Sequence, residues 1–378
     1  MESGAQVGEP GSTRDGLRLS VYFGERDHAD GRLLADVLIE RFARHGVATS
    51  VLLRGTEGFG IKHRLATERL LTLSEDLPLL AIAVDTPECI GAVLEEVRTL
   101  DFHGAVTLER ARLLRGGRSG VTLDPGSDEV KLTVYVGRQQ RLGGRPAYVA
   151  IVDCLHRHGV AGASVLLGLD GTLHGVRQRA RFFARNAQVP LMIQSVGDGE
   201  TIERALGEIA AMWEPSAGAG AATMTIERVR VCKRDGELLA EPLPAPDAEG
   251  SGHGYWQKLV VYTSERNRHQ RQPLHSALVR RLRLQGAAGA TALRGQWGYH
   301  GAHLPHGEAF WSLARHVPVL TVLMDTSENM RRWFAIVDEM TGETGLVTSE
   351  LVPALRALGP GIEHGGLKLA VRHGRSPG

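Results

Sequence analysis

LRLSVYFGER, residues 17–26, is the stretch that decides the fold, because it returns further along the chain. A shift of 240 positions places QKLVVYTSER, residues 257–266, on it, and the register then holds without a gap. A shift of 113 positions places KLTVYVG, residues 131–137, on the same positions, and RHGVA occurs at both 44–48 and 157–161. Self-similarity at fixed spacing indicates tandem structural repeats. We conclude that the chain contains three copies of one unit, and that the middle copy has diverged most.

Each copy shows the same order of expected elements. Alternating apolar and polar residues predict a half-buried first strand, and apolar runs predict the other strands. In the first copy the strands are residues 17–23, 47–53, 78–85 and 106–109. An apolar stripe at helical spacing ends at Gly46, and DTPE at 85–88 places a cap and a proline at the start of a second helix. The order β-α-β-β-α-β is the split pattern of the ferredoxin-like fold. Such a sheet has one face under its helices and needs a cover for the other.

We therefore expect an α+β protein of three tandem ferredoxin-like units, packed as an intramolecular pseudo-trimer. Pro/Gly-rich stretches predict linkers between the units, and the polar N-terminus without an apolar core predicts a disordered tail. The expected organisation is a tail at 1–15, unit 1 at 16–114, a linker at 115–128, the divergent unit 2 at 129–237, a linker at 238–254 and unit 3 at 255–374.

Composition excludes several classes of protein. The formal net charge is +1 with acids and bases interspersed, so no electrostatic surface for nucleic acid is expected. The three cysteines are widely separated and match no disulfide framework, which favours a reducing cytoplasm. The longest apolar runs, such as LPLLAIAV at 77–84, are too short to cross a bilayer, so direct membrane insertion is not expected.

The glycine-rich loop RGTEGFGIKHR, residues 54–64, has two interpretations. Its glycines would let the backbone approach a ligand while its basic side chains face an anion, or else they serve a turn whose charges are solvated. Only the glycines at 55 and 58 recur in all three copies, which indicates a demand on the backbone more than on charge. The candidate ligand-binding residues of this loop are Arg54, Gly55, Glu57, Gly58, Gly60, Lys62, His63 and Arg64.

Two further groups of residues are candidates. Glu25 and Arg26 follow the first strand and either line a cleft or form a turn and charge pair at its rim. In unit 3, the counterparts of Arg54, Gly55 and Gly58 are also candidate ligand-binding residues, namely Arg294, Gly295 and Gly298. The third copy also holds imidazoles at a spacing that can bind zinc, nickel or copper, or else are surface histidines, namely His300, His303 and His306. A regular helix is not expected there because of neighbouring glycine and proline, so a metal cofactor is not our first expectation.

No catalytic constellation emerges from spacing, so we do not expect an enzyme. Cys89 and Cys154 lie on predicted helices, and the sequence places no histidine–carboxylate pair beside either of them. Buried and unreactive thiols are therefore expected.

The motifs of the first unit resemble a known family. Tyr22, GE at 24–25, GVA at 46–48, RG-x-EGFG at 54–60, LSEDLP at 73–78 and VDT at 84–86 are similar to domain-of-unknown-function family one hundred and ninety. That family is placed in the PII-like superfamily of trimeric signalling proteins. The resemblance covers all three units, and the middle one matches least.

The resemblance implies ferredoxin-like subunits with inward-facing sheets and small-molecule clefts between neighbours, here supplied by one monomeric chain. Members often occur beside or fused to small membrane channels of the fluoride-exporting type, which implies a channel or transporter as a partner. After the second helix the sequence reads DFHGAVT, residues 101–107, without the glycine-rich motif of PII proteins, so the PII-type ATP site does not carry over.

Taken together, the sequence favours a cytoplasmic, non-enzymatic sensor that binds a small anionic ligand, with a nucleotide as one candidate. Divergence of the copies makes the clefts unequal, and we expect unit 1 or unit 3 to hold the better one. The alternatives are a ligand-independent interaction module for a membrane channel, and a metal-binding protein that acts through the histidines of unit 3.

Overall fold

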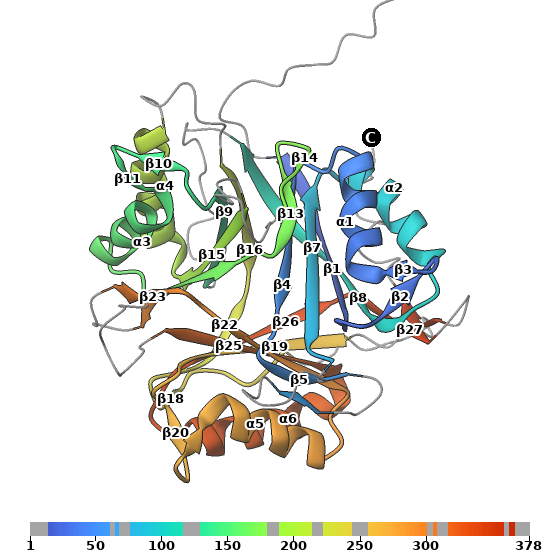
Figure 1. Cartoon of the computed structure of the whole chain (residues 1–378). Helices are drawn as coiled ribbons and strands as arrows, with labels where there is room; N and C mark the ends of the chain where they lie inside the picture. Colours follow the sequence, from blue (N-terminus) through green and yellow to red (C-terminus); the bar gives the residue numbers. More distant parts are fainter. Residues whose placement is uncertain are drawn as a thin grey trace, which may run out of the picture.

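The structure is a computed structural model (Figure 1) and describes only part of the chain. The described residues are 14–60, 65–67, 76–115, 129–179, 189–213, 222–243, 256–300, 305–307, 317–358 and 363–366. Most of the predicted tail and of both predicted linkers lies outside these ranges, as do Lys62, His63, Arg64 and His303.

The described residues form a mixed α+β protein made mostly of strands, with two helices in each third of the chain. The elements follow the predicted β-α-β-β-α-β order. In unit 1 they are β1 (Arg14–Gly24), α1 (Leu34–Arg44), β4 (Thr49–Arg54), β7 (Pro78–Asp85), α2 (Pro87–Arg98) and β8 (His103–Arg115). In unit 2 they are β9 (Val130–Gly137), α3 (Ala147–Arg157), β12 (Gly162–Leu167), β15 (Pro190–Gly197), α4 (Gly199–Trp213) and β16 (Thr223–Arg228). In unit 3 they are β19 (Trp256–Ser264), α5 (Leu274–Leu284), β22 (Gly289–Arg294), β25 (Pro318–Thr326), α6 (Ser327–Thr341) and β26 (Leu346–Val352).

All three units share one sheet topology. The strands are antiparallel, and the first strand lies between the third and the fourth, giving the orders β4-β7-β1-β8, β12-β15-β9-β16 and β22-β25-β19-β26. A short hairpin precedes the first helix of each unit: β2 (His28–Ala29) with β3 (Arg32–Leu33), β10 (Arg141–Leu142) with β11 (Arg145–Pro146), and β20 (Arg268–His269) with β21 (Gln272–Pro273). The sequence patterns did not predict these hairpins.

The helices cover the outer face of each sheet (Figure 1), and local sequence explains where they begin and end. Gly46 follows α1 with φ 64°, a left-handed conformation that glycine adopts without strain. The side chain of Thr86 accepts a hydrogen bond from the backbone N–H of Cys89 at the start of α2, as predicted for a cap. Each helix pair encloses its own apolar core, one per unit. None of the helices in the described ranges is long and apolar enough to cross a bilayer.

The inner faces of the three sheets cover one another. Apolar side chains from all three units form one central cluster that includes Val51, Leu80, Met192, Val260 and Leu320. The first strands are therefore buried on both faces, whereas their alternation of apolar and polar residues had predicted half-buried strands. The polar positions face the centre of the molecule instead of solvent.

A first set of strands passes from each unit to its neighbour. The loop strands are β5 (Glu57–Phe59), β13 (Asp170–Leu173) and β23 (Trp297–His300), each followed by a short partner, β6 (Ala66–Thr67), β14 (Val176–Arg177) or β24 (His306–Gly307). β5 of unit 1 pairs with β22 of unit 3, β13 of unit 2 with β4 of unit 1, and β23 of unit 3 with β12 of unit 2. The exchange is cyclic and involves all three units.

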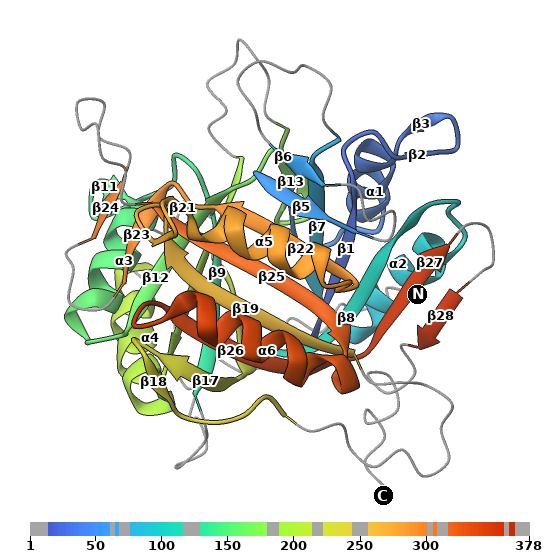
Figure 2. The same cartoon turned by 90° about the horizontal axis from the view of Figure 1, so that it is seen from below.

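A second exchange joins the fourth strands. The end of β8 pairs with β16 of unit 2, and two extensions, β17 (Arg230–Arg234) and β27 (Ala354–Leu358), pair with β26 of unit 3 and with β8 of unit 1. Figure 2 shows β27 beside β8. The short strands β18 (Glu237–Leu238) and β28 (Glu363–Gly366) pair with these extensions. Two cyclic exchanges thus interlace the units.

Candidate functional site: a cleft between units 1 and 3

A cavity of about 560 Å³ lies where unit 1 meets unit 3. Unit 1 supplies the end of β1, the start of β8 and the exchanged strand β5, and unit 3 supplies residues of β19, β22 and β25. This volume falls within the range of about 300–1,000 Å³ that is usual for small-molecule sites. The side chains that characterise the cavity are Phe23, Arg26, Phe59, His103, Trp256 and Met324.

One residue that lines the cavity differs in size among the three units. Ala105 faces Tyr22 across the sheet and lines the cavity. In unit 2 the equivalent tyrosine faces Thr223, whose hydroxyl oxygen accepts a hydrogen bond of 2.7 Å from the hydroxyl of Thr49 in unit 1. In unit 3 the equivalent tyrosine, Tyr262, pairs with Leu346, which is buried in the central cluster. Larger side chains thus occupy the two equivalent positions.

The cavity has an apolar interior and a polar rim. Asp76 accepts a hydrogen bond from the backbone N–H of Arg26, and Asp27 accepts one from that of Gly24, both at 2.7 Å. Within the described part of the chain, the Arg26 guanidinium forms no ion pair, and His103 lines the same cavity. A ligand with a flat apolar body matches the interior, and Arg26 offers a cationic group at a rim that also carries the carboxylates of Asp27 and Asp76.

A comparison with known protein families now identifies the chain. The model of DUF190, a family described as uncharacterised, matches residues 16–113, 129–231 and 256–354. The chain belongs to the DUF190 family. Its three matches correspond to the three repeats, which confirms the resemblance seen in the sequence.

The predicted loop residues of this DUF190 protein do not all meet at the cavity. Arg26, Gly58 and Gly60 line it. Arg54 instead forms an ion pair of 2.9 Å with Glu25, and both side chains are exposed. Lys62, His63 and Arg64 lie outside the described residues.

The repeated glycines are explained by the exchanged strands. A Cβ atom at Gly58 would lie 2.6 Å from the carbonyl oxygen of Ala290, and one at Gly298 would lie 2.1 Å from that of Ala163. At Gly55 and Gly295 the nearest atoms are ring carbons of Pro78 and Pro318 in the same unit, at 2.7 Å, and atoms of the neighbouring unit follow at 3.0 Å and 3.1 Å. Gly60, which does not recur in the other copies, has no atom within 4 Å of such a Cβ. The predicted demand on the backbone therefore comes from close packing between units.

A second, smaller cavity of about 200 Å³ lies on the helix side of the same interface. Its charged residues are already paired: Glu57 with Arg280 at 3.3 Å, and Arg294 with Glu265 at 2.5 Å. His275 also lines it, and burial, together with neighbouring arginines, lowers the pKa of this imidazole to about 4. Because these cations have partners, the smaller cavity suits an anion less well than the larger one.

The histidines of unit 3 are only partly described. The Nε2 atom of His300 lies 2.7 Å from a carboxylate oxygen of Asp235 in unit 2. His303 lies outside the described residues, and only the backbone of His306, in β24, is described. The described contact is thus an ion pair or hydrogen bond between units.

Sequence reasoning missed a buried charge cluster at the centre of the molecule. It consists of one basic residue from each first strand and one glutamate from each fourth strand, namely Arg18, Lys131, Lys258, Glu109, Glu227 and Glu350. Ion pairs run both within units and between them, and each glutamate has a basic partner from the first strand of a neighbouring unit. The basic residues recur at the repeat shifts of 113 and 240, and the glutamates end the repeated motifs VTLE, MTIE and VTSE, which was the available signal.

The charges in this cluster balance, with three cations and three carboxylates. Lys131 Nζ lies 2.6 Å from an oxygen of Glu227 and 2.6 Å from one of Glu350. Burial alone would raise the pKa of Glu109, but the charges of Lys258, Arg18 and Lys131 outweigh it and hold that pKa well below its usual range. The Glu109 carboxylate is therefore ionised, and all three carboxylates of the cluster have cations as partners.

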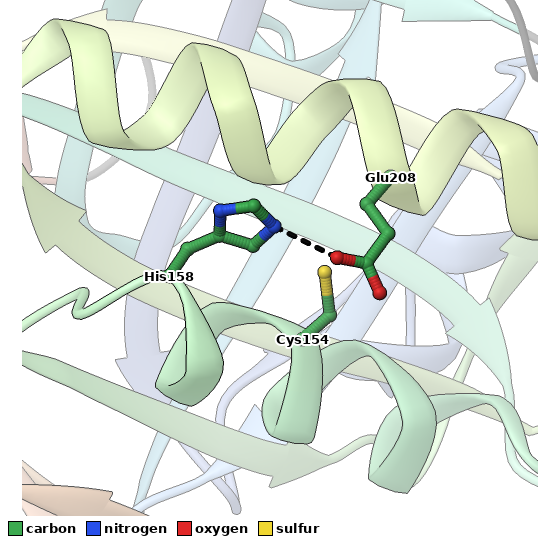
Figure 3. A group of neighbouring side chains, drawn as sticks. All are labelled: Cys154, His158 and Glu208. Atoms are coloured by element: carbon green, nitrogen blue, oxygen red, sulfur yellow. Dashed lines mark hydrogen bonds and ion pairs between the residues drawn. The ribbon is translucent and has the colours of Figure 1, made fainter.

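Two expectations about the cysteines are wrong. Cys89, which was expected to be buried, is only half-buried. Cys154 is buried, as predicted, but a histidine–carboxylate pair does lie beside it: His158 Nε2 is 2.8 Å from Glu208 Oε2 (Figure 3). Glu208 lies on α4, 50 residues after His158, so spacing along the chain could not reveal that the two side chains meet. Burial, with a smaller effect of Glu208, raises the pKa of the Cys154 thiol to about 12. Such a thiol is a poor nucleophile.

Proposed function

We propose that this chain is a PII-like sensor that binds a small molecule between units 1 and 3. In this proposal the three units are ferredoxin-like, and one polypeptide forms the pseudo-trimer that its superfamily builds from separate subunits. The strand order of each unit and the cyclic exchange of strands support that architecture. The observation that supports a site between units 1 and 3 is the cavity beside Ala105. At the equivalent positions of units 2 and 3 the larger side chains of Thr223 and Leu346 are present.

The chemistry of the cavity favours a ligand with an aromatic or apolar body and an anionic group. Trp256 and Phe59 offer aromatic surface, while Arg26 and His103 offer cationic or hydrogen-bonding groups at the rim. A nucleotide meets this description, with its base inside and its phosphates at the rim.

We further propose that the protein is cytoplasmic and not an enzyme. The described lining of the cavity contains no serine or cysteine that its histidine could activate. All three cysteines are free, which agrees with a reducing compartment. In this proposal the long loops between the second and third strands of the units would signal ligand binding to a partner such as a membrane channel.

Thermal-shift measurements with a panel of nucleotides and other anionic metabolites test the proposal. A ligand at 100 times its dissociation constant adds about 2.7 kcal/mol of stability to the native state. The change Ala105→Leu, which copies unit 3, should remove this shift without unfolding the protein, whereas Leu346→Ile at the equivalent position should retain it. Arg26→Ala should weaken anionic ligands selectively.

Two results would contradict the sensor. A flat screen combined with capture of a channel protein would favour the ligand-independent interaction module, and binding that survives Ala105→Leu would place the ligand elsewhere. The architecture has its own test, because a monomeric pseudo-trimer should sediment as one particle of 40.9 kDa. A stable trimer of chains would contradict it.

A further inference from the structure

The helical layer of unit 2 brings three metal-ligating side chains together. Cys154 lies on α3, His158 follows one turn later at its C-cap, and Glu208 faces them from α4 (Figure 3). One ligand atom from each, a thiol sulfur, an imidazole nitrogen and a carboxylate oxygen, lies within 4.8 Å of the others. Positions i and i+4 share one face of a helix, so the geometry follows from the spacing of the first two.

The residues equivalent to Cys154, His158 and Glu208 differ in units 1 and 3. In unit 1 the equivalent residues are Arg41, His45 and Glu96, and the Arg41 side chain lies 3.7 Å from the Glu96 carboxylate while His45 lies 2.7 Å from it. A cation therefore already sits beside the histidine–glutamate pair. In unit 3 the equivalents are Arg281, Gln285 and Ile336, which keep neither the histidine nor the carboxylate.

Unit 2 keeps the histidine–glutamate pair but replaces the arginine with a thiol. The positive charge that Arg41 supplies in unit 1 is thus missing, and a soft ligand stands in its place. Arg157 still pairs with Glu208, as Arg44 pairs with Glu96 in unit 1, so the substitution of the other arginine is the difference between the two sites.

We propose that Cys154 Sγ, His158 Nε2 and the Glu208 carboxylate bind a transition-metal ion of the Zn²⁺ class. Thiolate, imidazole and carboxylate together suit zinc and cobalt, and three protein ligands leave a fourth position for water or another molecule. Metal–ligand distances of about 2.0–2.3 Å put ligand atoms roughly 3.3–3.6 Å apart, so small side-chain rotations suffice.

The site is reachable from solvent on one side only. Cys154 is fully buried, whereas the side chains of His158 and Glu208 are 23% and 40% exposed. An ion would enter between these two and displace their mutual hydrogen bond. Arg157 competes for the carboxylate, so Arg157→Gln is expected to tighten binding.

Titration of the metal-stripped full chain with Co²⁺ tests the proposal. Cobalt bound to a thiolate gives a near-ultraviolet sulfur-to-metal charge-transfer band, which ions bound only by histidines do not give. We expect the band to saturate at one equivalent, to disappear on addition of Zn²⁺, and to be lost in Cys154→Ser and weakened at least tenfold in affinity in His158→Gln. The matched control Cys232→Ser changes another buried cysteine and should keep the band.

A gain of function completes the test. The change Arg41→Cys gives unit 1 the ligand set of unit 2 and should raise the saturation point from one equivalent of Co²⁺ to two. This variant keeps Cys154, so it remains informative even where Cys154→Ser folds poorly. The proposal is overturned if the unaltered protein shows no charge-transfer band, or if the band survives Cys154→Ser in a folded protein.

Discussion

Removing one cation from the central charge cluster should cost far more stability than removing a surface charge. The change Lys131→Met keeps the length of the side chain but leaves three carboxylates facing two cations. Glu227 then has Arg18, at 3.6 Å, as its remaining partner in the cluster. Breaking a buried ion pair from one side costs about 3–5 kcal/mol, a large part of a typical unfolding free energy of about 5–15 kcal/mol.

The effect can be measured by urea unfolding followed by circular dichroism at pH 7. A charge-balanced double variant, Lys131→Met with Glu227→Gln, should lose less stability than Lys131→Met alone, because two cations then face two carboxylates. Arg54→Ala is the matched control, since its ion pair with Glu25 is exposed and such pairs contribute about 0–1 kcal/mol.

The pH dependence has a definite sign. In the unaltered protein the folded pKa of Glu109 is lowered, so its contribution is complete above the unfolded value of about 4.3 and is lost only as the pH falls through the lower folded pKa. In Lys131→Met a glutamate gains a proton more easily, so the deficit relative to the unaltered protein should shrink as the pH falls from 7 to 5. A loss below about 1 kcal/mol at pH 7, or a double variant as unstable as the sum of the single ones, would refute the reasoning.

Three further changes test other contacts. Gly58→Ala should destabilise the protein by about 1–3 kcal/mol because its Cβ would meet the backbone of β22, whereas Gly60→Ala in the same loop should have little effect on thermal unfolding. Asp325→Ala should cost about 1–3 kcal/mol by leaving the indole N–H of Trp333, at 2.7 Å, and the backbone N–H of Ala288, at 2.9 Å, without their acceptor. Asp325→Asn should restore only part of this loss, because its amide nitrogen cannot accept from the N–H groups that face one of the two oxygens. Because burial lowers the folded pKa of His275 to about 4, the unfolded state binds more protons below pH ~6.5, and stability should fall as the pH drops from there to 4; an unchanged slope in His275→Gln would contradict this assignment.

The order of elements was predictable because its signals are local. Alternation in LRLSVYF, the glycine at 46 and the cap at 86 each depend on a few neighbouring residues, and the repeats supplied three independent readings of them. The need to cover the inner sheet faces followed from the same patterns. The polar residues of the first strands were misread, because alternation cannot distinguish a face in water from a face packed on charged neighbours.

The sites depended on contacts between distant parts of the chain and were less predictable. Alignment of the copies shows Ala105, Thr223 and Leu346 at one position, but only the structure shows that Ala105 lines a cavity between units. Likewise the Cys154 thiol meets Glu208 through helix packing. The spacing of residues along the chain identifies possible ligands on the same helix, but it does not show which residues of a second helix pack against them.

Because of the exchanged strands, early parts of the chain must wait during synthesis for partner strands that are translated much later. Phe59 of β5 pairs with Ala290 of β22, which leaves the ribosome 231 residues later. At about 5–20 residues per second, the first unit waits roughly 10–45 s for this partner, and β8 waits longer still for β27. Throughout that interval the nascent chain presents an unpaired strand edge and an uncovered apolar sheet face. Folding of this protein therefore requires that the incomplete nascent chain be protected from aggregation. Slower translation of the last third should increase aggregation rather than improve the yield of folded protein.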